Sequence, residues 1–146
     1  MTEAISPQQL TKQGQAAYQR GSYAEAAQAF QAAGQGYQAQ GDRLSAAEAA
    51  NNASVAYLQA GQPNEALDAA QGTAAVFAAA GDLHRQALAL GNIAAALEAS
   101  DHFDEALEAY QQSADLLKQT GNDALRLNVM QSLSNLQLRT GRQLQA

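Results

Sequence analysis

The chain of 146 residues contains no cysteine and no tryptophan, only 2 prolines, and 5% aromatic residues. Without cysteine it can form neither a disulfide framework nor a thiol nucleophile. The scarcity of aromatic and β-branched residues argues against a β-rich fold. The abundant residues favour helices instead, with 36 alanines and 21 glutamines. The composition therefore predicts an all-α protein.

Positive charge is also scarce, because 8 lysines and arginines stand against 14 acidic residues and leave a net charge of -6. This balance provides no basic surface for nucleic acid or for an anionic membrane. No apolar run reaches the roughly 18 residues of a membrane span, and residues 1–10 lack the basic and apolar segments of a secretion signal. We expect a soluble, cytoplasmic protein that binds neither nucleic acid nor a membrane.

Turn signals recur every 40 residues in two interleaved series. One series is Gly21, Gly61 and Gly141, with Asp101 in the remaining slot, and the other is Gly41, Gly81 and Gly121. A glycine just past a helix end adopts the left-handed conformation without steric strain. A following Asp or Asn, or a capping box such as Ser22 with Glu25, can bind the free N–H groups of the next helix. The pattern therefore predicts a new helix about every 20 residues.

These turns predict a single domain over residues 1–146, built from three and a half helix-turn-helix repeats. The seven expected helices span residues 7–20, 23–40, 43–60, 63–80, 83–99, 103–120 and 123–140. The repeats occupy approximately residues 7–41, 42–81 and 82–121, and a C-terminal capping helix occupies residues 122–140.

Five further glycines fall inside the expected helices, where each costs roughly 1 kcal/mol relative to alanine. We expect them to mark places where helices approach closely. At Gly91 a second interpretation stays open, in which the missing side chain lets a ligand approach the backbone. The five are Gly14, Gly34, Gly36, Gly72 and Gly91.

Large and small residues alternate along the second helix of each repeat, as in the pairs Ala26 with Phe30 and Ala106 with Tyr110. This pattern and the segments 21–26 (GSYAEA) and 102–107 (HFDEAL) resemble the tetratricopeptide repeat (TPR) family over the whole chain. The common repeat has ~34 residues and a proline near its end, but here the proline slots hold Gln38, Ala78 and Lys118. The chain therefore resembles a long, 40-residue TPR variant. The resemblance implies an α-α superhelix, a TPR solenoid whose last helix caps the array.

The resemblance also places the first helix of each repeat on a concave face. In the second repeat Asn52 lies opposite the packing stripe, and Asn92 occupies the same slot one repeat later. A carboxamide both donates and accepts hydrogen bonds, so this pair can hold an extended peptide backbone. The alternative is that both are simply solvated polar residues. The predicted groove comprises Gln15, Tyr18, Asn52, Val55, Leu58, Gln59, Asn92, Ala95, Asn135 and Leu138; these can also be surface residues, or core residues in the case of Tyr18 and Leu138.

The sequence offers little for catalysis, since it has two histidines and neither a phosphate-binding loop nor a zinc-binding motif. We expect no enzyme activity, no metal and no cofactor. The favoured function is a protein–protein interaction scaffold, or adaptor, that binds a peptide or protein segment in the concave groove. The alternative is a self-association module that forms a homo-oligomer through the terminal helix, using Leu127, Met130, Leu133 and Leu136.

Overall fold

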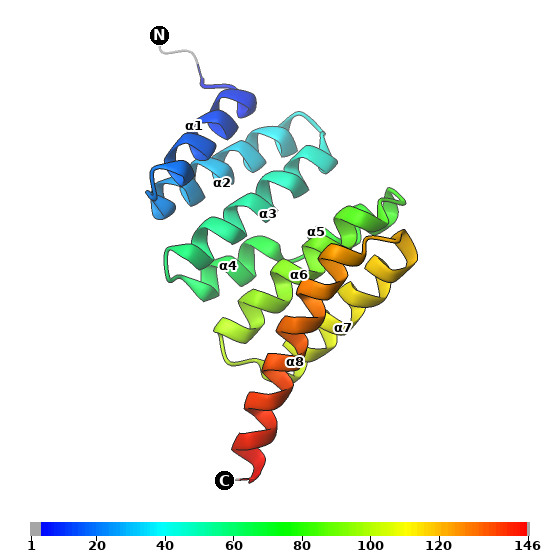
Figure 1. Cartoon of the computed structure of the whole chain (residues 1–146). Coiled ribbons are helices and arrows are strands. Elements are labelled where there is room, and N and C mark those ends of the chain that lie inside the picture. The colour runs from blue at the N-terminus through cyan, green and yellow to red at the C-terminus, as the bar shows by residue number, and fades with distance from the viewer. Residues whose placement is uncertain (1–3, 146) are drawn as a thin grey trace.

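The computed structural model describes residues 4–145, and within them the chain is helical without strands (Figure 1). All seven predicted helical segments are present, and the fourth is divided in two. The helices are α1 (Pro7–Gln19), α2 (Tyr23–Ala39), α3 (Arg43–Gln59), α4 (Pro63–Ala70), α5 (Thr73–Ala79), α6 (Leu83–Ala99), α7 (Phe103–Thr120) and α8 (Asp123–Gln145).

The helices stack in chain order as two layers, with the two ends of the chain at opposite ends of the array (Figure 1). We call α1, α3, α6 and α8 the A layer, and α2, α4, α5 and α7 the B layer. Each inner A helix packs against the B elements before and after it, and α3 also contacts α6. This is the α-α superhelical arrangement that the resemblance to TPR proteins implies.

The predicted turns depend on left-handed residues. Asp101 has a φ of 63° in the slot where the other turns have glycine, and Asp tolerates this conformation better than most residues. Gly141 is the exception, because α8 continues through it to Gln145. The expected end of the last helix at residue 140 is therefore wrong. The glycines that do adopt the left-handed conformation at the predicted turns are Gly21, Gly41, Gly61, Gly81 and Gly121.

Side chains that follow the turns cap three of the helices, as predicted. The carboxylates of Asp42 and Asp82 and the carboxamide of Asn122 each accept a hydrogen bond from a backbone N–H three residues later. The predicted capping box at Ser22 is wrong, since its side chain makes no capping hydrogen bond. The capping box that forms is at the start of α1, between Ser6 and Gln9.

The predicted continuous helix over residues 63–80 is also wrong, because Gln71 is extended and Gly72 is left-handed with a φ of 80°. A side chain at Gly72 would meet nothing within 4 Å, so this glycine serves the break and not a close helix approach. Thr73 restarts the helix and donates its hydroxyl to the Ala70 carbonyl at 2.7 Å. Thr73 and Phe77 stay buried beyond the break, so the packing stripe continues through it.

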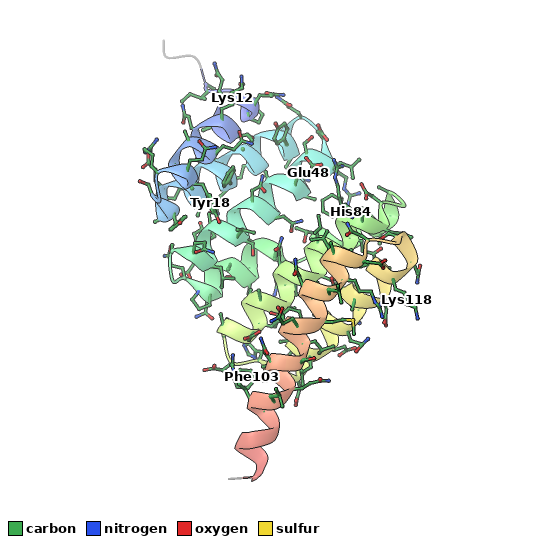
Figure 2. All side chains as sticks on the ribbon, in the orientation of Figure 1. Lys12, Tyr18, Glu48, His84, Phe103 and Lys118 are labelled. Atoms are coloured by element: carbon green, nitrogen blue, oxygen red, sulfur yellow. The ribbon has the colours of Figure 1, made fainter. Side chains whose placement is uncertain are left out.

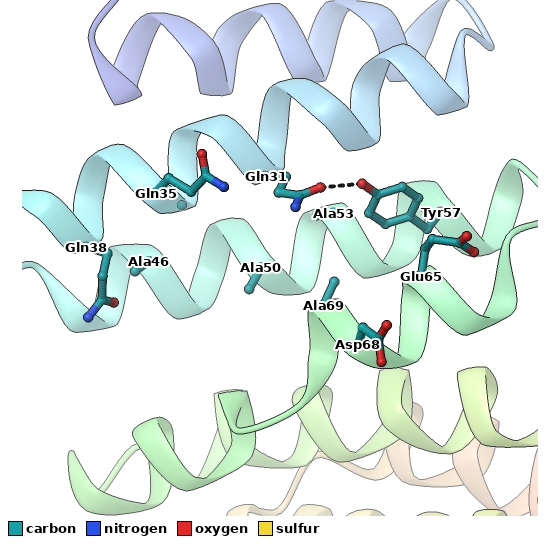
Figure 3. Close-up of a pocket in the computed structure, with 11 residues that line it drawn as sticks. Gln31, Gln35, Gln38, Ala46, Ala50, Ala53, Tyr57, Glu65, Asp68 and Ala69 are labelled. Atoms are coloured by element: carbon teal, nitrogen blue, oxygen red, sulfur yellow. Dashed lines mark hydrogen bonds between the residues drawn. The ribbon is translucent and has the colours of Figure 1, made fainter.

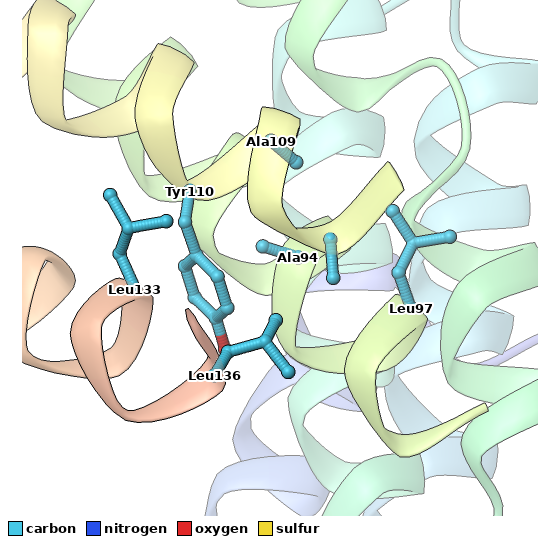
Figure 4. Close-up of a cluster of buried hydrophobic side chains, with 7 residues drawn as sticks. Ala94, Leu97, Ala109, Tyr110, Leu133 and Leu136 are labelled. Atoms are coloured by element: carbon cyan, nitrogen blue, oxygen red, sulfur yellow. The ribbon is translucent and has the colours of Figure 1, made fainter. Parts of the chain in front are cut away.

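The core is made chiefly of alanines and a few large side chains. At the C-terminal end, Leu133 and Leu136 of α8 pack against Tyr110 and the alanines of α6 and α7 (Figure 4). The last helix thus packs against α7 at the C-terminal end of the array. Leu133 and Leu136 are consequently unavailable for self-association, whereas Leu127 is 65% exposed and Met130 is 38% exposed.

Candidate functional site

The A-layer face is hollowed between neighbouring A helices. The first hollow, about 330 Å³ in volume, lies between α1 and α3. It brings together four predicted residues, Gln15, Tyr18, Asn52 and Val55, and Phe30 of α2 also lines it. The Tyr18 ring is half-buried and packs edge-on against Tyr23 at 5.0 Å, near the N-terminal end of the array (Figure 2). Tyr18 thus both belongs to the packing and lines the hollow.

A second hollow of about 240 Å³ lies between α6 and α8, and α7 also lines it. The predicted residues Asn92 and Ala95 line it together with Leu88, which is 39% exposed. Gly91 lies in the same hollow, and a Cβ there would meet only the Ser113 hydroxyl, at 3.8 Å. Since that is ordinary contact, packing does not require glycine at this position, and the interpretation in which a ligand approaches the backbone stays open.

The third hollow, about 460 Å³, holds Asn135 and Leu138 of α8 beside Glu98 and Arg139. Leu138 is 57% exposed, so the alternative placing it in the core is wrong. The Glu98 carboxylate binds the Arg139 guanidinium at 2.9 Å and accepts a hydrogen bond from the Tyr110 hydroxyl at 2.9 Å. Burial and this hydrogen bond raise the pKa of Tyr110, since both disfavour the phenolate.

Asn52 and Asn92 lie on the neighbouring helices α3 and α6, but they line different hollows. Neither carboxamide makes a hydrogen bond within the part of the chain that the structure describes. Both therefore keep their donors and acceptors for a ligand or for water. Leu58 is half-buried and Gln59 is exposed near the end of α3, and neither lines the three hollows.

Glu48, which lies four residues before Asn52 on α3, already has a partner. The Glu48 carboxylate binds the Arg85 guanidinium of α6 at 2.8 Å, and Arg85 also lies 3.5 Å from Asp82. This ion pair joins neighbouring A helices. Both side chains of the Glu48–Arg85 pair are about half exposed, so we expect it to add little to stability.

Sequence analysis missed several residues that line the hollows, among them Phe30, Ser132 and Arg139. The 40-residue period contained a signal for two of them. Phe30 lies two repeats before Tyr110, which lines the second hollow, and Ser132 follows Asn52 and Asn92 in the same slot. Phe30 and Tyr110 are largely buried and also line the hollows, so each ring belongs to both the core and the site.

Within residues 4–145, no group of three or more His, Cys, Asp or Glu side chains is placed to hold a metal ion. His84 and His102 are both exposed. No helix in residues 4–145 combines the length and the apolar character needed to cross a membrane.

A two-layer array of stacked helices defines an α-helical repeat protein. The family model of the soluble NSF attachment proteins (SNAP) matches residues 8–146. The chain therefore belongs to the SNAP family, a non-catalytic adaptor family whose members take part in protein interactions. None of the curated proteins compared with the chain matches it.

Proposed function

We propose that this chain is an adaptor that holds a protein or peptide segment along its A-layer face. The observation that carries the proposal is the set of hollows that open between the A helices beside carboxamides without hydrogen-bond partners in the described residues. We also infer that its units are long TPR-type repeats of 40 residues, that residues 1–146 act as one cytoplasmic domain, and that the A-layer face is concave.

The chemistry of this face suits the backbone of a bound segment. Asn52 and Asn92 can each donate to and accept from a peptide group. Between them Val55 and Ala95, both half-buried, offer apolar contact, and the Tyr18 ring adds a larger apolar surface at one end of the array. Because the family's name refers to attachment of NSF, NSF is the first partner to test.

Site-specific crosslinking tests this proposal. A photo-reactive phenylalanine analogue is placed singly at Val55 and Ala95 on the A layer, and at the exposed B-layer residues Gln28 and Glu108 as matched controls. After irradiation with purified NSF, and separately in cell extract, mass spectrometry identifies the crosslinked segments. We expect the A-layer positions to capture one common protein segment and the controls to capture none. Equal capture from the two layers would contradict the proposal.

The second candidate function is self-association through α8. In α3 and α6 the corresponding slots, Ala47 and Ala87, are fully or almost fully buried, whereas Leu127 of α8 is 65% exposed. A second copy that covers Leu127 and Met130 would bury this apolar surface. Sedimentation velocity over a range of concentrations measures the oligomeric state. A dimer that the Leu127→Glu variant no longer forms supports self-association, and a strict monomer at high concentration contradicts it.

A further inference from the structure

The B-layer face carries a groove that sequence analysis did not predict (Figure 3). It has a volume of about 440 Å³ and lies over α3 between α2 and α4. Its floor is formed by Ala46, Ala50 and Ala53. One repeat later the same slots hold larger residues, Gln86, Leu90 and Ile93. The three alanines therefore leave room that side chains of leucine or isoleucine size would occupy.

The break in the second B helix keeps the groove open along its length. Helix α4 ends at Ala70. Figure 3 shows the chain turning away from α2 after Ala69 and continuing into α5, so that Gln35 and Gln38 of α2 face space on this side. The groove is lined along α3 from Tyr57 to Ala46, and its volume of about 440 Å³ falls in the usual range of ligand pockets.

One end of the groove is acidic. Glu65 and Asp68 lie three residues apart on α4, and both are exposed. Neither carboxylate forms an ion pair within the described residues. The Tyr57 ring lies at the same end, and its hydroxyl donates a hydrogen bond to the Gln31 carboxamide oxygen (Figure 3). This end therefore presents two carboxylates and an aromatic ring to a ligand.

We propose that this groove binds a protein segment that presents an arginine next to short aliphatic side chains. The guanidinium binds between Glu65 and Asp68, because its planar donors match carboxylates, and the nearby Tyr57 ring attracts the cation. The aliphatic side chains lie on the alanine floor. Gln35 and Gln38, with donors and acceptors, bind the segment's backbone. The groove lies on the layer opposite the proposed adaptor face. Failure of one proposal therefore does not contradict the other.

The probe is the acetylated and amidated heptapeptide Ala-Leu-Ala-Arg-Ala-Leu-Ala, titrated into the full-length, ¹⁵N-labelled chain. We expect saturable chemical-shift changes confined to the amides of the groove, and no such changes with a peptide that has glutamate or norleucine in place of arginine. Equal binding of the norleucine peptide would overturn the proposal, as would shifts spread over other faces.

Two variants locate the binding. We expect Glu65→Gln with Asp68→Asn to weaken binding of the heptapeptide by roughly tenfold, since each charge-assisted contact is lost. The matched control is Glu105→Gln with Glu108→Gln, which removes two acids from the same slots one repeat later and should leave the affinity unchanged. Equal weakening by the control pair would show that the peptide is attracted by the net negative charge of the chain and not by the groove carboxylates, and would overturn the proposal.

The second variant, Ala50→Leu, fills the groove floor with leucine, the residue that occupies the equivalent position 90 one repeat later. It leaves both carboxylates in place, so it tests the cavity separately from the charge. We expect it to abolish the shifts while circular dichroism shows an unchanged helical fold. Undiminished binding to a folded Ala50→Leu variant would contradict the assignment of the groove.

Discussion

At the scale of single residues, the packing of neighbouring helices depends on glycines inside them. A Cβ added at Gly14 would lie 2.7 Å from the Phe30 ring, whereas one at Gly34 would lie 3.6 Å from its nearest neighbours on α3. Gly14 therefore leaves room for the Phe30 ring. Gly34 has no such packing role, so it only lowers helix stability through its greater backbone entropy in the unfolded chain.

Replacing these two glycines should have opposite effects on stability. We expect Gly14→Ala to lower the free energy of unfolding by roughly 1–3 kcal/mol, because Phe30 must shift. Gly34→Ala, the matched control, should raise it by about 0.5–1 kcal/mol. Urea denaturation followed by circular dichroism measures both. A stabilising Gly14→Ala would contradict the packing described for α1 and α2.

Tyr110 makes stability depend on pH in the alkaline range. Its pKa in the folded chain is raised above the usual value of about 10 by burial and by the hydrogen bond to Glu98. Ionisation above pH ~10 therefore favours the unfolded chain, so the stabilisation present below that pH is lost as the pH rises. We expect the urea midpoint to fall above pH ~10 less steeply in Tyr110→Phe than in the native chain. Identical slopes would show that another group titrates.

At the scale of elements, the 40-residue period predicted the number and order of the helical segments, because each turn has a left-handed Gly or Asp and every second turn adds a side chain that caps the next helix. The period did not predict the break at Gly72 or the continuation of α8 through Gly141. A glycine in a helical pattern is compatible with a helix interior and with a break, and tertiary packing decides between them. Thr73 and Phe77 stay buried beyond the break, as Ser113 and Leu117 do in the same slots of the unbroken α7, so the packing stripe is compatible with either arrangement.

The last helix has only α7 as its main packing partner, so its anchoring residues should be sensitive. We expect Leu136→Ala to destabilise the chain by about 2–5 kcal/mol, because the side chain is fully buried and its removal leaves a cavity. Hydrogen exchange should quicken first in α8. Leu138→Ala, on an exposed side chain, should change stability by no more than about 0.5 kcal/mol. Equal effects of the two changes would contradict the placement of α8.

At the scale of the whole molecule, the two layers present different chemistry. The A-layer hollows have unpaired carboxamides and half-buried apolar residues, while the B layer has an alanine-floored groove with acids at one end. Sequence analysis predicted the first face, because residues such as Asn52 lie opposite the packing stripe. It did not predict the second face. That groove exists because Ala50 is smaller than Leu90, the residue in the same slot one repeat later, and because the B helix breaks after α4.

The most direct test measures the affinity of the A-layer face for the segment captured by crosslinking at Val55 and Ala95, made as a synthetic peptide. We expect calorimetry to show that replacing both Asn52 and Asn92 with alanine weakens binding by roughly tenfold, since each lost hydrogen bond is worth about 0.5–1.5 kcal/mol. Asn64→Ala, at an exposed carboxamide on the B layer, should leave the affinity unchanged. An unchanged affinity in the double variant, or the same loss in Asn64→Ala, would contradict the assignment of the A layer as the binding face.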